Sequence, residues 1–299
     1  MTDDLTPETA PEEAPETPAP ETPAADAPAE AQADAAGGEG QPALLCLPGL
    51  TRNCRDFEAL ASRLAPRFRV ITPSFRGRGD SGYARDPLTY VPLTYLQDMG
   101  LLLDAAKADK VVIIGTSLGG LIGLLLDVTQ RQRIAGLVLN DVGPDMNAEG
   151  LARIRAGLGK GGNWPSWLTA ARDIARRQAE IYPGWSLQQW LAHAKRLCRV
   201  SRAGPIAWDY DPEIAAPLNL PHGNDQLDLW LALDSFRGRP LLSIRGALSD
   251  ILMADTQAQM AARMPGLAAV TVPRVGHAPT LEEPEAVVAL ERYLSQFAA

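Results

Sequence analysis

The stretch Val111-Val-Ile-Ile-Gly115-Thr-Ser117-Leu-Gly119-Gly120 decides the fold, because a glycine-rich turn joins two apolar runs within it. The β-branched residues before the turn predict a buried strand at 111–114, and the apolar residues 118–128 predict a helix. Ser117 stands between the two, with a glycine two residues away on either side. It is therefore either a helix-capping residue in a plain turn or a hydroxyl that the turn exposes for chemistry.

The strand-turn-helix context favours the second interpretation of Ser117. Glycines at this spacing remove side chains from a sharp turn, so that the serine Oγ stands free at the end of the strand. A helix that begins directly after the serine also presents unpaired N–H groups to developing negative charge. The pattern predicts that Ser117 is a nucleophile.

Short apolar runs alternate with helical patterns from residue 43 onward. Strands are predicted at residues 43–47, 69–72, 111–114, 134–139, 241–244 and 268–272, and helices at 57–64, 91–106, 118–128, 256–264 and 284–297. This alternation indicates an α/β fold with a mostly parallel sheet and helices on both faces. Ligands of such sheets bind at the carboxyl ends of the strands.

Two segments depart from this alternation. Residues 1–41 contain eleven acidic residues, seven prolines and no Lys or Arg, so we expect a disordered acidic tail. Residues 144–222 lack strand patterns, and Ser166 and Ser186 are predicted to cap amphipathic helices there. We expect residues 144–222 to form a helical cap, and residues 42–143 with 223–299 to form the core.

Composition and charge exclude several classes of protein. Residues 42–299 carry 28 basic and 25 acidic residues without a basic stripe, which argues against a nucleic-acid-binding protein. No apolar run approaches the ~18 residues of a membrane span.

Three irregularly spaced cysteines and no secretory signal predict free thiols and a cytoplasmic location. The three histidines lack the spacing of metal ligands, so no metal site is predicted.

A serine hydroxyl needs a base to remove its proton and a third group to orient that base. His193 falls within a predicted cap helix and His222 within a turn, whereas His277 follows the last strand and precedes the last helix. His277 should therefore project from the edge of the sheet that carries Ser117. We predict that His277 is the base.

Two acids compete to orient His277. Asp250 follows the strand after the cap, and Asp141 follows the strand before it. Both satisfy the chain order serine, acid, histidine. We favour Asp250, and Asp141 is then expected to fix the loop that leads into the cap.

The turn after the first strand, Leu47-Pro-Gly49-Leu50, can complete the site. The backbone N–H groups of Leu50 and Leu118 are predicted to form an oxyanion hole around a carbonyl oxygen. Arg52, Trp164 and Trp167 are predicted substrate contacts, with packing of the cap onto the core as the alternative role of the tryptophans. The cap holds ten basic and seven acidic residues, which indicates either a preference for anionic acyl groups or solvated helix faces.

Five motifs in this order resemble those of the α/β-hydrolase fold family. They are Leu47-Pro-Gly-Leu50, Arg76-Gly-Arg-Gly-Asp-Ser-Gly82, Gly115-Thr-Ser-Leu-Gly-Gly120, Arg245-Gly-Ala-Leu-Ser-Asp250 and Gly276-His-Ala-Pro-Thr-Leu-Glu-Glu-Pro284. The resemblance implies a cofactor-free hydrolase acting on a small-molecule carbonyl substrate. Ser117 would attack the carbonyl, His277 would shuttle the proton, and Asp250 would steady the imidazolium.

The chain looks most similar to the capped branch of this family, which contains carboxylesterases, enol-lactonases and carbon-carbon bond hydrolases. It departs from that branch at the usual first hairpin, which is missing, so we expect about six strands. It also has Ala278 where ring-cleavage hydrolases often have an aromatic residue after the histidine.

The leading functional prediction is an esterase or lactonase that acts through an acyl-enzyme on Ser117. A carbon-carbon bond hydrolase and an acyltransferase of the same fold are alternatives, because an acyl-enzyme can also pass its acyl group to an alcohol or thiol. A non-catalytic ligand-binding protein is the alternative of another class, and an acidic tail that docks on basic partners would suit it.

Overall fold

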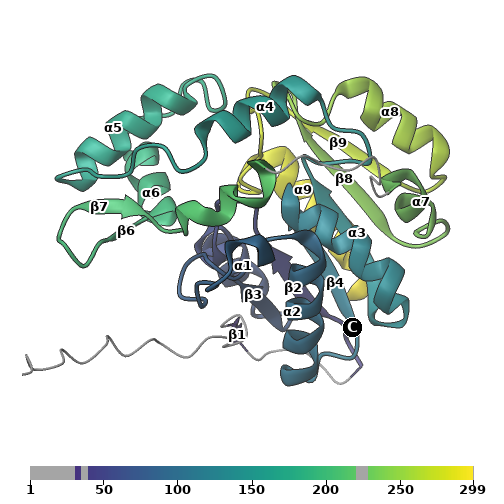
Figure 1. Cartoon of the computed structure of the whole chain (residues 1–299). Helices are drawn as coiled ribbons and strands as arrows, with labels where there is room; N and C mark the ends of the chain where they lie inside the picture. The colour runs from purple at the N-terminus through teal and green to yellow at the C-terminus, as the bar shows by residue number, and fades with distance from the viewer. Residues whose placement is uncertain (1–30, 35–39, 220–227, 299) are drawn as a thin grey trace, which may run out of the picture.

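A seven-stranded sheet forms the centre of the computed structural model, which describes residues 31–34, 40–219 and 228–298 (Figure 1). The strand order is β1-β3-β2-β4-β5-β8-β9. Six of these strands run parallel: β2 (Ala43–Leu47), β3 (Val70–Pro73), β4 (Val111–Thr116), β5 (Ile134–Asn140), β8 (Leu241–Gly246) and β9 (Ala268–Val272). The predicted α/β fold with a mostly parallel sheet is confirmed.

Strand β1 (Ala31–Asp34) adds an antiparallel seventh strand beside β3. It lies within the segment predicted to be disordered, so that prediction is wrong for residues 31–34, and the sheet is one strand wider than expected. Main-chain hydrogen bonds to the open edge of β3 require no apolar side chains, which is why composition gave no sign of this strand. Residues 1–30 and 35–39 of the predicted tail lie outside the described residues.

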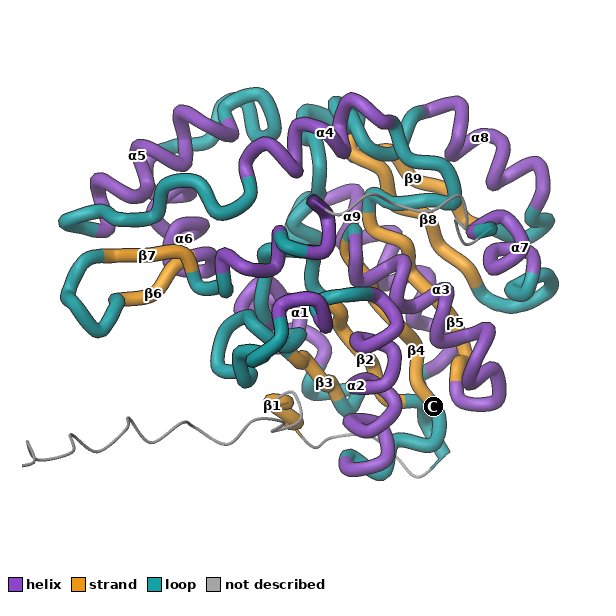
Figure 2. Tube along the Cα trace, in the orientation of Figure 1, coloured by secondary structure: helices purple, strands orange, loops and turns teal. Residues whose placement is uncertain are grey.

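Helices cover both faces of the sheet (Figure 2). Along β4, Val111 and Ile113 belong to one buried cluster, and Val112 and Ile114 belong to the other. The first cluster takes side chains from α2 (Pro92–Ala105), α3 (Leu118–Gln130), α7 (Leu229–Asp234) and α8 (Ala254–Arg263), and the second from α1 (Glu58–Leu64) and α9 (Pro284–Leu294). Burial on both faces explains why β4 is a continuous apolar run.

Short 3-10 helices occupy several of the connections: η1 (Cys54–Phe57), η2 (Pro87–Thr89), η3 (Arg131–Arg133), η4 (Pro212–Ala215), η5 (Pro217–Asn219) and η6 (Ser295–Phe297). Cys46, Cys54 and Cys198 are free thiols, as predicted. Among the described helices, none combines the length and hydropathy that crossing a membrane requires.

Between β5 and α7 the chain leaves the sheet, and we call residues 144–219 the cap segment. It contains α4 (Ala148–Gly157), α5 (Trp167–Gln178) and α6 (Leu187–Leu197). The side chains of Ser166 and Ser186 accept hydrogen bonds from the first turns of α5 and α6, as predicted. Residues 220–222 of the predicted cap, including His222, lie outside the described residues.

The cap segment is not entirely helical, and that part of the prediction is wrong. Helix α6 runs directly into an antiparallel hairpin of β6 (Cys198–Val200) and β7 (Ile206–Trp208). Gly204 in its turn has φ +103°, a backbone conformation that glycine adopts without strain. The two strands are too short for their residue pattern to show a period of two.

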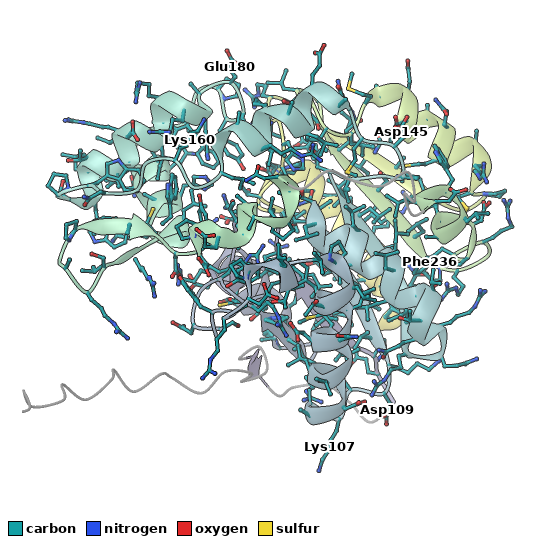
Figure 3. All side chains as sticks on the ribbon, in the orientation of Figure 1. Lys107, Asp109, Asp145, Lys160, Glu180 and Phe236 are labelled. Atoms are coloured by element: carbon teal, nitrogen blue, oxygen red, sulfur yellow. The ribbon has the colours of Figure 1, made fainter. Side chains whose placement is uncertain are left out.

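The cap segment lies beyond the carboxyl ends of the parallel strands (Figure 1). In Figure 3, Lys107 and Asp109 mark the connection that enters β4, and Lys160 of the cap segment lies at the opposite side of the molecule. The edge of the sheet that carries Ser117 therefore faces the cap segment.

Candidate active site

Ser117 lies in a strained turn between β4 and α3. Its φ of +52° and ψ of −117° are rare for a residue with a side chain. A Cβ added at Gly115 would lie 2.5 Å from the Gly119 carbonyl, and one added at Gly119 would lie 2.1 Å from the carbonyl oxygen of Leu47. Only glycines allow the helix to start this close to the strands, so the packing holds the serine in the predicted strand-turn-helix geometry.

Replacing Gly119 with alanine should lower the free energy of unfolding by about 1–3 kcal/mol or more, because the new methyl group meets backbone atoms rather than a movable side chain. Denaturant unfolding measures this change. Gly157→Ala is the matched control, since a Cβ there meets nothing within 4 Å and alanine favours the helix by up to ~1 kcal/mol. Equal unfolding free energies for the two variants would contradict the role of Gly119.

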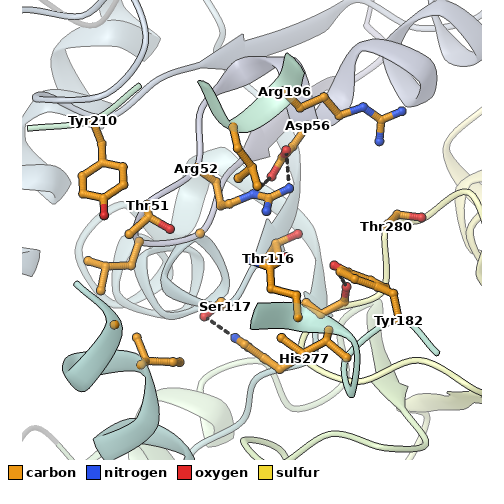
Figure 4. Close-up of a pocket in the computed structure, with 18 of the residues that line it drawn as sticks. Thr51, Arg52, Asp56, Thr116, Ser117, Tyr182, Arg196, Tyr210, His277 and Thr280 are labelled. Atoms are coloured by element: carbon orange, nitrogen blue, oxygen red, sulfur yellow. Dashed lines mark hydrogen bonds and ion pairs between the residues drawn. The ribbon is translucent and has the colours of Figure 1, made fainter. Parts of the chain in front are cut away.

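His277 connects Ser117 to a buried carboxylate. Its Nε2 lies 2.9 Å from Ser117 Oγ, and its Nδ1 lies 2.7 Å from Asp141 Oδ2 (Figure 4 draws the bond to Ser117). Because a carboxylate only accepts, a ring with a single proton carries it on Nδ1, and Nε2 then accepts from the Ser117 hydroxyl. This arrangement lets His277 take a proton from Ser117, which is what nucleophilic activation requires.

Asp141, rather than Asp250, is the acid beside His277. Asp141 follows β5 directly, has φ +57° and is fully buried. Its Oδ1 accepts from the N–H of Gly246 at 2.7 Å, and its Oδ2 also accepts from the hydroxyl of Ser249 at 2.6 Å. Three donors hold the carboxylate in one orientation and satisfy its charge in the protein interior.

Our preference for Asp250 as the partner of His277 is therefore wrong. Asp250 pairs with Arg153 of α4 through Nε–Oδ2 (2.5 Å) and Nη2–Oδ1 (2.8 Å), and both side chains are about half exposed. Burial raises the pKa of Asp250, but the hydrogen bonds and charge of Arg153 outweigh this effect and lower the pKa below its usual value. Asp250 lies four residues after the end of β8, and the cation with which it pairs, Arg153, belongs to the cap segment.

Leu50 and Leu118, the predicted oxyanion donors, belong to backbone segments that meet beside Ser117. A Cβ added at Gly49 would lie 3.7 Å from Ser117 Cβ, so the turn that carries Leu50 lies against the serine. Leu118 begins α3, and the first N–H groups of a helix have no partner within it. The fully buried Arg78 donates from Nε to the Leu50 carbonyl at 2.8 Å and so fixes this turn, a contact that the sequence did not indicate.

Two further side chains hold the loop that carries His277. Asn140 Nδ2 donates to the Pro279 carbonyl at 2.9 Å, and the Tyr182 hydroxyl of the cap segment donates to the Ala278 carbonyl at 2.8 Å. The N–H of Gly276 also donates to the carbonyl of Ile181 at 2.7 Å. Asn140 could have been predicted as a site residue because it ends strand β5. Nothing in the sequence marks Tyr182.

A cavity of about 440 Å³ opens beside Ser117 and His277 (Figure 4). Of the three predicted substrate contacts, Arg52 lines the cavity, whereas Trp164 and Trp167 are not among its lining residues. Trp164 is buried, donates from Nε1 to Asp173 and packs edge-on against Trp208. The tryptophan in the wall is Trp208 of β7, which sequence reasoning missed because the hairpin was missed.

His193, which was not favoured as the base, is buried in the cap segment. Its ring lies edge-on to Tyr182, Trp185 and Trp190. Burial, followed by the charges of nearby arginines, lowers the pKa of His193 well below its ordinary value. His193 is therefore a neutral packing residue of the cap segment.

Comparisons with known proteins place the chain in a family. The model of the Alpha/beta hydrolase family matches residues 44–290. The 3-hydroxybutyrate-oligomer hydrolase of Cupriavidus necator is 34% identical, and the match covers 86% of this chain and 90% of that protein. The pimeloyl-[acyl-carrier protein] methyl ester esterase of Xanthomonas campestris is 27% identical, and the match covers 85% of this chain and 95% of that protein. The crystal structure of an α/β hydrolase from Novosphingobium aromaticivorans is 50% identical and covers 89% of this chain and 93% of its own, with a TM-score of 0.84.

Proposed function

Since the chain belongs to the α/β-hydrolase family, we propose that it is a serine hydrolase that cleaves carboxylic esters or lactones through an acyl-enzyme on Ser117. The hydrogen-bonded chain from Ser117 through His277 to Asp141, at the wall of a cavity, carries this proposal. A nucleophile, a base and a group that orients the base are the parts that acyl transfer needs.

The mechanism follows from the positions of these groups. Ser117 Oγ attacks the ester carbonyl while its proton passes to His277 Nε2, and the N–H groups of Leu50 and Leu118 receive the oxyanion. The intermediate collapses as His277 gives the proton to the departing alkoxide. Water, deprotonated by His277, then attacks the acyl-enzyme, and the bond to Ser117 Oγ breaks as His277 returns the proton to that oxygen, which releases the carboxylic acid. Asp141 keeps the proton on Nδ1 and stabilises the imidazolium in both half-reactions.

The substrate class we propose is a small or medium ester, with oligoesters of hydroxyacids as the first natural candidates. The name of the Cupriavidus necator relative states that it hydrolyses 3-hydroxybutyrate oligomers, whose units are joined by carboxylic esters. A cavity of about 440 Å³ has the size of sites that enclose small organic ligands.

A panel of p-nitrophenyl esters, simple lactones and 3-hydroxybutyrate dimers and trimers tests the proposed activity. We expect turnover of esters, and a fluorophosphonate probe should attach to the peptide that contains Ser117, as seen by mass spectrometry. Heat-unfolded protein is the control for non-specific labelling. Labelling elsewhere, or turnover without labelling, would contradict the acyl-enzyme on Ser117.

Product analysis separates the ester hydrolase from its alternatives. With added alcohols or thiols, an acyltransferase would form new esters or thioesters in preference to free acid, and a carbon-carbon hydrolase would turn over ring-cleavage products rather than esters. A ligand-binding protein without turnover would leave Ser117 unlabelled. We expect free acid as the main product.

A further inference from the structure

We propose that the cavity contains a subsite for a carboxylate group carried by the ester substrate, with Arg52 as its principal ligand. The inference rests on the proposed function for the ester itself, and it names the class of substrate: esters with a free carboxylate in their acyl or alcohol part. The charges, positions and contacts of the cavity wall support it.

The lining of the cavity is rich in cations. Its basic residues are Arg52, Arg153, Lys160, Arg177 and Arg196, and its one carboxylate among the described residues is that of Asp56. The acids that pair with Arg153, Arg177 and Arg196 are Asp250, Asp173 and Glu282, which do not line the cavity. Because five cations and one carboxylate line the cavity, the charge of its wall favours an anion.

The side chain of Arg52 begins beside the reacting serine and lines the same cavity. A Cβ added at Gly49 would lie 3.3 Å from Arg52 Cγ and 3.7 Å from Ser117 Cβ, so the stem of Arg52 starts beside the nucleophile. Figure 4 shows Arg52 with its partner Asp56, and Arg196 lies beyond Asp56 in this view. A carboxylate a few carbon atoms from the scissile carbonyl can reach this guanidinium.

Asp56 holds the guanidinium of Arg52 without occupying all its donors. Arg52 Nε and Nη2 contact the two oxygens of Asp56 at 2.6 and 2.7 Å. The third nitrogen, Nη1, carries two N–H groups and takes no part in this pair; its neighbour is Nε2 of the neutral His193 at 3.5 Å. A guanidinium fixed on one side with donors left on the other is suited to bind a second carboxylate.

Two pairs of esters test the subsite, each pair differing only in whether a carboxylate is free or capped by a methyl group. Mono-4-nitrophenyl adipate and its methyl ester place the carboxylate in the acyl part. 3-Acetoxybutyrate and its methyl ester place it in the alcohol part, with release of acetate as the readout. In at least one pair, kcat/KM for the anion should exceed that for the neutral ester by about tenfold or more, the range of charge-assisted hydrogen bonds.

Variants of the two members of the ion pair should move this anion-to-neutral ratio in opposite directions. Arg52→Gln removes the cation and should bring the ratio close to one. Asp56→Asn removes the competing carboxylate and should raise the ratio above that of the parent. Poor folding cannot produce opposite shifts in a ratio. Arg67→Gln, an exposed arginine that pairs with Glu291 outside the cavity, is the matched control and should leave the ratio unchanged.

A binding measurement separates the subsite from the proposed catalysis. Calorimetry with Ser117→Ala protein should show that monomethyl adipate binds more tightly than dimethyl adipate, and that Arg52→Gln in the same background removes the difference. Equal binding of the two, or an anion-to-neutral ratio that Arg52→Gln leaves unchanged, would overturn the subsite. Absence of ester turnover with selective binding of the monoanion would overturn the proposed function and keep the subsite.

Discussion

Replacing Ser117 with alanine is expected to lower kcat for ester hydrolysis by at least about 10⁴-fold while the protein stays folded. The variant loses the atom that His277 Nε2 contacts at 2.9 Å, whereas the turn is held by the glycines around it. Activity that remains would come from substrate binding and the oxyanion donors acting on water. Initial rates with a p-nitrophenyl ester measure the loss, and thermal unfolding checks the fold.

Ser201→Ala is the matched control for this experiment. Ser201 lies in the turn of the cap hairpin, away from the cavity lining, and its alanine variant should keep the parent rate. If Ser117→Ala retained more than about a tenth of the parent rate, hydrolysis would not proceed through an acyl-enzyme on this residue. Another nucleophile, or water activated directly by His277, would then carry the reaction.

The sequence was sufficient to predict those residues of the candidate site whose neighbours in the chain form a recognisable pattern. The turn around Ser117 has its own signature, because a strand, a glycine pair and a helix follow each other without a gap. His277 could be preferred to His193, because His277 follows strand β9 whereas His193 lies within helix α6. The predicted strands also appear as the parallel part of the sheet, since short apolar runs between helical patterns are typical of such strands.

The choice between the two acids could not be made from the sequence. Both follow strands that end at the same edge, and side-chain direction depends on backbone beyond those strands. Asp141 turns toward His277 because its φ of +57° bends the chain directly after the last residue of β5, where the N–H of Gly246 from β8 meets it. Asp250 instead forms an ion pair with Arg153, which lies almost a hundred residues earlier in the chain, on α4. Such long-range pairs leave no local pattern.

Two substitutions of aspartate by asparagine separate the acids. Asp141→Asn is expected to lower kcat by about 10³–10⁴-fold, whereas Asp250→Asn should stay within about threefold of the parent. The N–H of Gly246 requires an acceptor, so the amide oxygen of the substituted side chain must stay where Oδ1 of Asp141 accepts that bond. Its NH₂ group then replaces Oδ2 and faces His277 Nδ1. The ring is forced into the tautomer with a proton on Nε2, which cannot take the proton of Ser117.

The stability of the two variants provides a second, independent contrast. Asp141 is fully buried with three donors, so its loss should cost about 1–3 kcal/mol of unfolding free energy. Asp250 belongs to an exposed ion pair, and its loss should cost at most about 1 kcal/mol. Initial rates at saturating ester check the predicted changes in kcat. Urea unfolding of the same preparations checks the predicted changes in unfolding free energy. A large loss of kcat in Asp250→Asn with an active Asp141→Asn would show that the acid moves during catalysis and that Asp250 replaces Asp141 beside His277 in the working enzyme.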